Sequence, residues 1–205
     1  MESNPDIAAV VESAPDGTVY TFRSHAFVNE RTYRLTDDAL VVEEAGKPPG
    51  GAFFDGIAEV RLAYTPTRAA TNRYRAQIIY KAGGMAELFN LHYRGIMDFP
   101  EQNAAYVAFL TELHRRLVAK GKDVQFRAGN TIGAYIGNWA LTVFIFAALL
   151  LVLFVLIPNI GGTWIVFAKL AIILFFIPVL IQYMRKAKPR SYDPLAIPKD
   201  VLPDL

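Results

Sequence analysis

Two long apolar runs in the C-terminal third of the chain constrain its fold more than any other feature. Residues 139–157 carry no charged side chain, and residues 163–184 carry one, Lys169. A helix of about 19 residues is ~28 Å long, close to the ~30 Å hydrocarbon core of a bilayer. Only a short turn at residues 158–162 separates the runs, so the sequence predicts a transmembrane helical hairpin over 139–184. The alternative is a pair of buried core helices, which the rest of the chain is too short to cover.

Basic residues predict how such a hairpin would be oriented. They lie on both flanks and are missing from the connecting turn. Since basic residues favour the cytoplasmic side, both termini of this multi-pass arrangement are expected in the cytoplasm. Residues 1–17 lack a basic start and a continuous apolar stretch, so they are predicted to be a flexible N-terminus and not a signal peptide. The flanking residues are Arg115, Arg116, Lys120, Lys122, Arg127, Arg185, Lys186, Lys188 and Arg190.

Two features near the apolar runs have more than one interpretation. Lys169 lies roughly 9 Å into the second run, and its side chain is expected to extend along the helix to the membrane surface. The alternative is a partner carboxylate in another subunit. Gly129, Gly133 and Gly137 recur at a spacing of four and would form one smooth helix face for close packing. Residues 122–138 are equally consistent with a flexible juxtamembrane linker.

Residues 18–121 are predicted to form a β-rich domain with one helix. Apolar and polar residues alternate in residues 20–28, 58–64 and 74–80, which is typical of half-buried strands. Shorter strand candidates occur between them, separated by glycine- and proline-containing turns. About seven strands at short intervals favour a small antiparallel sandwich or barrel. The overall fold class is therefore α+β or mainly β, followed by the two membrane helices.

A single amphipathic helix is predicted after the strands. Its apolar residues recur at spacings of three and four, which places them on one face of a helix. Asp98 and Glu101 resemble a capping box at its start, and Gly121 is expected to end it. The helix is expected to pack on the sheet and to cap it. The apolar face consists of Tyr106, Phe109, Leu110, Leu113 and Leu117.

Two sequence runs resemble bacterial pleckstrin-homology-like domains. Residues 33–42, YRLTDDALVV, resemble their opening hairpin, and residues 54–60, FDGIAEV, are similar to the element that follows. The resemblance covers roughly residues 15–120. It implies a bent, nearly orthogonal sandwich capped by a C-terminal helix, used as a binding or assembly module that often accompanies membrane spans. The basic first loop of phosphoinositide-binding members is missing, since residues 28–32 read VNERT, and inositol-lipid binding is not expected.

The sequence contains no residue pattern typical of catalysis or metal binding. It has no cysteine, no phosphate-binding loop and no hydrolase motif. His25, His92 and His114 are widely separated, and each is expected at the surface or at an interface. We therefore expect a protein that is not an enzyme and that has no cofactor and no metal site.

A strip of basic residues is the polar feature that most suggests a partner. Residues 60–86 contain no Asp or Glu, and their alternation places three of the arginines on the outer side of their strands. Such a strip fits anionic headgroups or an acidic partner protein, and the alternative is a solvated sheet face paired with local acids. Nucleic acid is not expected, because the tyrosines of this region alternate toward the core. The basic residues are Arg61, Arg68, Arg73, Arg75 and Lys81.

Residues 185–205 form a proline-rich tail that is expected to be extended, because four prolines prevent a regular helix. It would dock in a groove of this domain or of another protein, or stay disordered. The sequence as a whole predicts a bacterial inner-membrane protein that presents a binding or scaffolding module as an accessory subunit or assembly factor. Its expected partners are the lipid bilayer and a membrane or cytoplasmic protein or a second copy. The alternative is a component of a small transport or channel assembly with Lys169 in the membrane.

Overall fold

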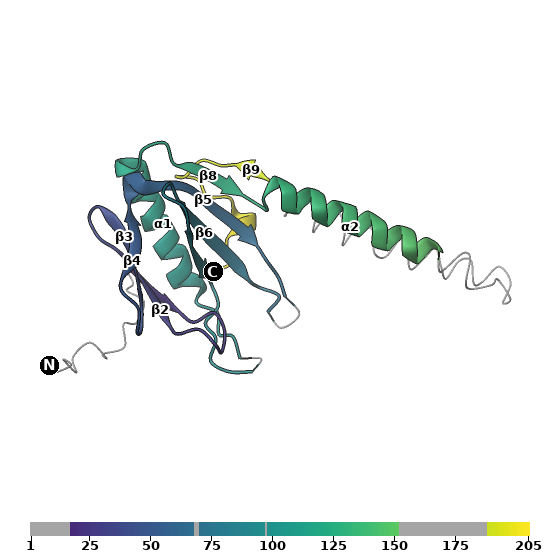
Figure 1. The fold of residues 1–205 in the computed structure, drawn as a ribbon, viewed down its shortest axis with the longest axis horizontal. Coiled ribbons are helices and arrows are strands. Elements are labelled where there is room, and N and C mark those ends of the chain that lie inside the picture. The colour runs from purple at the N-terminus through teal and green to yellow at the C-terminus, as the bar shows by residue number, and fades with distance from the viewer. Residues whose placement is uncertain (1–16, 68–69, 97, 152–187) are drawn as a thin grey trace. The chain divides into compact units, whose positions relative to one another are not determined.

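The computed structural model describes residues 17–67, 70–96, 98–151 and 188–205. The chain divides into two compact units, one formed by residues 1–128 together with 190–205 and the other by residues 129–189. In the described residues, the first unit contains two β-sheets and helix α1, and the second contains helix α2 (Figure 1).

The first sheet is a four-stranded antiparallel meander in chain order. Its strands are β1 (Val19–Phe22), β2 (Arg31–Leu35), β3 (Ala39–Glu44) and β4 (Gly50–Phe53). Gly51 has a φ of 124° in β4, and a Cβ there would collide with the carbonyl of Leu40 on β3. This position therefore requires glycine. A short 3₁₀ turn, η2 (Phe54–Gly56), then leads into the second sheet.

The second sheet has the strand order β7-β6-β5-β8-β9. β5, β6 and β7 are antiparallel neighbours, β8 is parallel to β5, and β9 is antiparallel to β8. β8 falls in the predicted linker and β9 in the predicted tail, so the described residues hold nine strands where the sequence predicts about seven. Both are short, and their pairing is non-local, so no alternation pattern or adjacent turn indicates them. The strands are β5 (Ile57–Tyr64), β6 (Tyr74–Tyr80), β7 (Met85–Phe89), β8 (Gln125–Ala128) and β9 (Arg190–Ser191).

Helix α1 (Asn103–Lys120) packs with its predicted apolar face against the sheets. All five residues of that face are buried, and Gly121 follows the last turn, donating its N–H to the carbonyl of Leu117. The predicted helix is confirmed. The predicted capping box is wrong, because the N-cap is Gln102, which makes no side-chain capping hydrogen bond, and Asp98 lies in a bridge with Gly95.

Two buried tyrosines connect the sheets to each other and to α1. The hydroxyl of Tyr20 donates to the carbonyl of Phe89 on β7 at 2.6 Å, and that of Tyr33 donates to the carbonyl of Glu87 at 2.7 Å. Both rings also contact Phe109 of α1, at centroid distances of 5.8 and 6.5 Å. Burial raises the pKa of the Tyr20 hydroxyl. These contacts satisfy the polar ends of two large core side chains, as buried tyrosines require.

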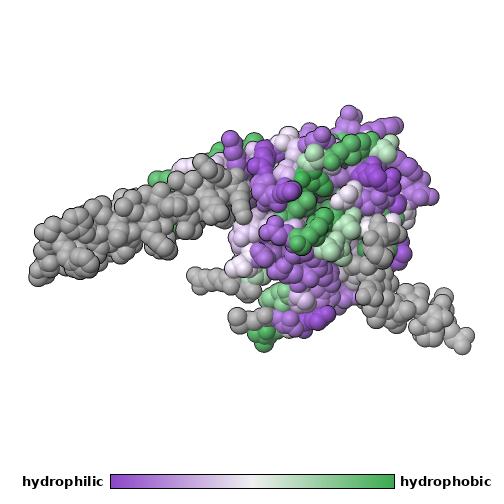
Figure 2. All heavy atoms as spheres, turned by 180° about the vertical axis from the view of Figure 1, so that it is seen from behind, coloured by the Kyte–Doolittle hydropathy of each residue, from purple (hydrophilic) through white to green (hydrophobic). Residues whose placement is uncertain are grey.

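The C-terminal tail docks on this same unit. β9 extends the sheet beyond β8, and a 3₁₀ turn, η4 (Lys199–Val201), follows and buries Val201. Tyr192, Ile197 and Leu202 pack against the core. Seen from behind, hydrophobic residues gather in a small area among mostly hydrophilic ones (Figure 2).

The predicted transmembrane hairpin is corrected by the structure. Helix α2 (Ile132–Leu151) holds residues 139–151 of the first predicted run, and its first turns include Gly133, Gly137 and Asn138. Residues 152–157 of that run lie outside the described residues. Within residues 17–67, 70–96, 98–151 and 188–205, no helix combines the length and apolarity that a bilayer crossing requires. The predicted fold class, with two membrane helices, and the multi-pass inner-membrane location are therefore wrong. The second predicted run lies outside the described residues.

The first unit should fold without the second. Residues 128 and 190 are neighbours in the antiparallel β8–β9 ladder, so residues 129–189 leave and re-enter the unit at one point. We expect a chain in which an Asn-Gly turn replaces residues 129–189 to unfold cooperatively on heating. It should also keep the amide NMR signals of the native sheets, because such a turn closes a two-strand antiparallel ladder. A chain without cooperative unfolding would contradict the division into units.

Acid should destabilise the first unit through His114. Burial lowers the pKa of His114 from 6.5 to about 4, so the folded unit holds it neutral while the unfolded chain protonates near 6.5. This difference in pKa contributes about 3 kcal/mol to the free energy of unfolding. The contribution is fully present above pH 6.5 and is lost as the pH falls toward about 4. Urea unfolding from pH 7 to 4 should show this slope, and His114→Phe should remove it. An equal pH slope in both chains would contradict the assignment.

Candidate functional site

The predicted basic strip meets acidic residues on the outer face of the second sheet. Arg61 is buried, and its Nε donates to Glu59 Oε1, two residues earlier on β5, at 2.7 Å. The other carboxylate oxygen of Glu59 lies 3.7 Å from Nε of Arg127 on β8. Arg61 is thus enclosed beside a counter-charge and does not present a free cation to a partner.

Glu87 neutralises the next part of the same face. The register aligns Arg61 with Gln77 and Gln77 with Glu87 across three strands. Gln77 donates to Glu87 Oε1 at 2.6 Å, and Arg75 Nη1 lies 3.7 Å from the same oxygen. The acid-free window of the sequence ends one residue short of Glu59 and one short of Glu87. Glu59 shares the face of Arg61 because the two lie two residues apart on β5, and strand pairing brings Glu87 onto the same face.

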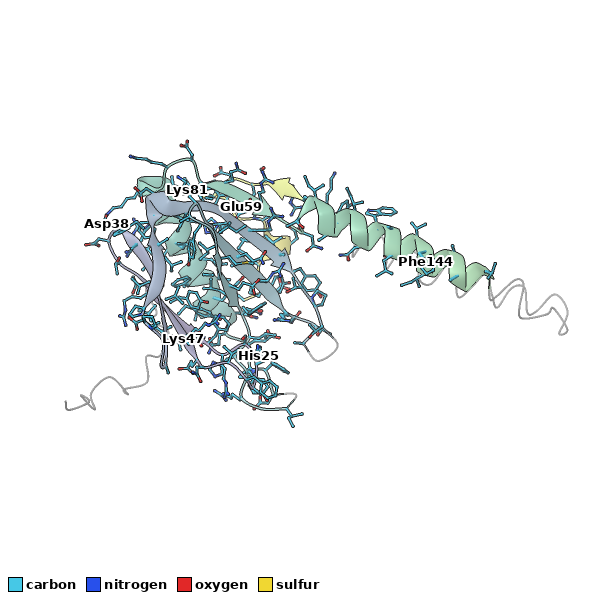
Figure 3. All side chains as sticks on the ribbon, in the orientation of Figure 1. His25, Asp38, Lys47, Glu59, Lys81 and Phe144 are labelled. Atoms are coloured by element: carbon cyan, nitrogen blue, oxygen red, sulfur yellow. The ribbon has the colours of Figure 1, made fainter. Side chains whose placement is uncertain are left out.

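The other predicted site residues are dispersed. Lys81 donates from Nζ to the carbonyls of Asp55 and Lys122, both at 2.8 Å, and thereby joins η2 to the loop between α1 and β8. Lys81 and Asp38 lie at the opposite end of the unit from His25 (Figure 3). Gly133 and Gly137 lie in α2, with nothing within 4 Å of a Cβ built on either, while Gly129 precedes that helix with a φ of 85°. Arg68 and Lys169 lie outside the described residues.

Of the basic residues predicted as partner contacts, Arg73 lines a cavity. Three segments far apart in the sequence enclose a cavity of about 250 Å³, which we call the loop-end pocket. They are the β1–β2 loop, the β5–β6 loop and the segment between β7 and α1. The apolar lining comes from Phe89, Leu91 and Phe99. The full lining is Ser24, His25, Thr67, Ala70, Arg73, Phe89, Leu91 and Phe99.

Asn90 holds two of these segments in place. Its side chain is fully buried, and its Oδ1 accepts the backbone N–H of Tyr74 at 2.8 Å, next to Arg73. Its Nδ2 donates to the carbonyl of Asn72 at 2.9 Å and to Oδ1 of Asn103 at 2.8 Å. A buried amide with all these partners fixes the end of the β5–β6 loop against the start of α1.

Arg73 stacks on the floor of the pocket. Its guanidinium carbon lies 4.0 Å from the centroid of the Phe89 ring, a cation–π contact. Burial and the neighbouring charge of Arg75 lower the pKa of the Arg73 guanidinium, which still carries its charge at neutral pH. Among the described residues, no carboxylate lies within ion-pair distance of Arg73, and the pocket lining contains no acid. Glu87, on the neighbouring strand β7, opposes this lowering of the Arg73 pKa without forming an ion pair with it. The pocket therefore combines an apolar floor with one half-buried cation that has no ion-pair partner among the described residues.

Two fully exposed apolar side chains stand on the loops beside this pocket. Phe27 is 96% exposed on the β1–β2 loop, and Ile96 is 93% exposed on the segment before α1. The two loops are joined, because Tyr93 donates its N–H to the carbonyl of Arg23, whose guanidinium lies over the Tyr93 ring. Arg23 also donates to the carbonyls of Ala26 and Val28, which orders the first loop.

His25 lies on the rim of the pocket. It accepts a weak 3.4 Å hydrogen bond from the N–H of Phe27, and the two rings are in tilted contact. Within the described residues, no three metal-binding side chains gather. The sequence predicts Arg73 as a site residue but does not predict its pocket. Nothing in the sequence around Phe89, Leu91 and Phe99 indicates that these residues lie beside Arg73.

His114 departs from the expectation of a surface or interface position shared with the other histidines. It is buried beneath the docked tail, 1% exposed. His114 lies four residues after Leu110 and three residues before Leu117, which puts it at the edge of the apolar face of α1. That spacing is the sequence feature from which its burial could have been anticipated.

Breaking the buried ion pair of the second sheet should destabilise the unit. Glu59→Gln removes the charge beside Arg61, whose side chain is 7% exposed, and should cost about 3 kcal/mol of unfolding free energy. The matched change is Glu43→Gln, because Glu43 Oε1 lies 3.9 Å from Arg34 Nε and the side chains of Arg34 and Glu43 are 42% and 47% exposed. It should lower the free energy of unfolding by less than ~0.5 kcal/mol. Equal losses in urea unfolding would contradict this assignment of the outer face.

No protein-family model and no curated protein matches this chain. A solved structure described as "Structure of the Spt16D Pob3N heterodimer" aligns with a TM-score of 0.31 and 11% sequence identity. The alignment covers 56% of this chain and 53% of that one, so the match spans about half the length of each. A likeness of this size identifies neither a family nor a function.

Proposed function

We propose that this chain is a non-enzymatic binding module whose loop-end pocket receives an acidic and apolar segment of a protein partner. The observation that carries the proposal is Arg73, a half-buried guanidinium stacked on Phe89 in a pocket that has no acid in its lining. A cation held in an apolar hollow favours a ligand that supplies both a carboxylate and an apolar side chain.

The dimensions and the surroundings support a peptide ligand. A cavity of about 250 Å³ accommodates one large side chain, and Phe89, Leu91 and Phe99 supply an apolar surface for it. The exposed Phe27 and Ile96 would extend the contact beyond the pocket. Arginine and aromatic residues together are typical of the central residues of protein interfaces.

Several sequence-based expectations stay predictions beside this proposal. The resemblance to pleckstrin-homology-like domains, the scaffolding role and self-association are among them. The present proposal assigns the partner contact to Arg73 and not to the whole basic strip, because Arg61 and Arg75 lie beside Glu59 and Glu87.

The proposal predicts that the pocket distinguishes a carboxylate from its neutral analogue. N-acetylphenylalanine, titrated into the ¹⁵N-labelled full chain, should bind in the millimolar range and shift the amide signals of Arg73 and Leu91. N-acetylphenylalaninamide, with the same ring and no charge, should bind about tenfold more weakly. Arg73→Gln should reduce the affinity for the acid to that for the amide and leave the affinity for the amide unchanged.

Arg34→Gln is the matched control, because Arg34 is a half-buried arginine on the first sheet, away from the pocket lining. It should leave both affinities unchanged. The proposal is wrong if acid and amide bind equally well to the native chain, if neither shifts these signals, or if Arg34→Gln has the same effect as Arg73→Gln.

A further inference from the structure

The C-terminal tail packs against α1 and β8, and we call the surface that it covers there, which includes His114 and Phe126, the groove. Tyr192 donates its backbone N–H to the carbonyl of Phe126 at 3.2 Å, and its ring contacts the rings of Phe126 and His114. Next to it, Ser191 pairs with Arg127 in the β8–β9 ladder. The tail thus extends a sheet edge by backbone pairing and inserts one side chain beside it, as peptide ligands of sheets do.

His114 fixes which side chain fits at this point. Its Nδ1 lies 2.6 Å from the carbonyl of Leu110, an acceptor, so Nδ1 carries the proton and Nε2 does not. Nε2 lies 2.7 Å from the hydroxyl of Tyr192, which therefore donates to it. A phenylalanine in place of Tyr192 would leave a buried acceptor without a donor. The groove thus selects a tyrosine hydroxyl.

A second anchor holds the far end of the tail. Val201 is 1% exposed, and Leu202 packs against the core beside it. Asn103, at the start of α1, donates from Nδ2 to the carbonyl of Asp204 at 3.1 Å. Arg190 and Asp200 form an ion pair inside the tail. The two anchors, Tyr192 and Val201, lie on opposite sides of a proline-containing stretch.

The groove and the tail belong to separate parts of the chain. The groove side chains all come from residues before 129. The tail lies in the same compact unit, but along the chain it is connected to them only through residues 129–189 of the second unit. We propose that this groove is a peptide-binding site and that residues 190–205 are its tethered ligand. The ligand class is an extended, proline-containing peptide with a tyrosine at the position of Tyr192 and a valine at that of Val201. A tether gives the tail an effective concentration in the ~mM range, which closes the site to free peptides while the tail is docked.

The test uses the full chain with its own tail released by Tyr192→Ala and Val201→Asp. The probe is a fluorescein-labelled synthetic peptide of residues 188–205, followed by anisotropy. It should bind the released chain at least tenfold more tightly than the native chain, whose groove is filled. A probe with Tyr192→Phe should bind five- to tenfold more weakly, and His114→Phe in the released chain should abolish that difference. A probe with Leu205→Ala is the control, since Leu205 is 87% exposed, and should bind like the native peptide.

Three results would overturn the proposal. If the released chain loses its cooperative unfolding and its dispersed amide spectrum, the tail is an integral part of the fold and not a ligand. If the released chain folds but does not bind the peptide at 1 mM, the groove is not a peptide site. If the native probe and the Tyr192→Phe probe bind equally, His114 does not select the tyrosine.

Discussion

The hydroxyl of Tyr20 joins three parts of the domain at one buried point. Its hydrogen bond to the carbonyl of Phe89 connects the first sheet to the edge strand of the second, and its ring packs on Tyr106 and Phe109 of α1. Because the hydroxyl is buried, it must keep that acceptor, which fixes where β7 ends relative to β1. The guanidinium of Arg73 in turn stacks on the ring of Phe89. The position of the pocket thus depends on a contact of the core.

The two proposed sites share this framework and differ in chemistry. At the loop end, an arginine faces an apolar hollow and favours a carboxylate. On α1, a neutral histidine faces a tyrosine hydroxyl and requires a donor. The Asn90 amide lies between them, since it contacts Asn72 near the pocket and Asn103, which also binds the end of the tail. Both sites are therefore connected to the same hydrogen bonds of Asn90 and Asn103.

Local patterns in the sequence predict the local parts of this structure. The spacing of Tyr106, Phe109, Leu110, Leu113 and Leu117 predicts α1 and its buried face, and alternation predicts β5 and β6. Non-local pairing is where prediction fails. Glu87 reaches the basic face only through strand register, whereas Glu59 lies there by the two-residue alternation of β5. β8 and β9 pair without any adjacent turn. The transmembrane hairpin is a separate error, because no helix of the described residues combines the length and apolarity that a bilayer crossing requires. The pocket is assembled from three distant loops, and only Arg73 could be named beforehand.

The state of the Arg73 side chain tests the central claim most directly. A ¹⁵N NMR spectrum of the guanidinium reports both its stacking and its partner. In the free chain, the Arg73 Nε–H signal should lie upfield because of the Phe89 ring and should exchange rapidly, as expected without a carboxylate partner. Addition of N-acetylphenylalanine should move it downfield and slow its exchange. A signal that is already downfield and protected in the free chain, and unchanged by the acid, would contradict the account.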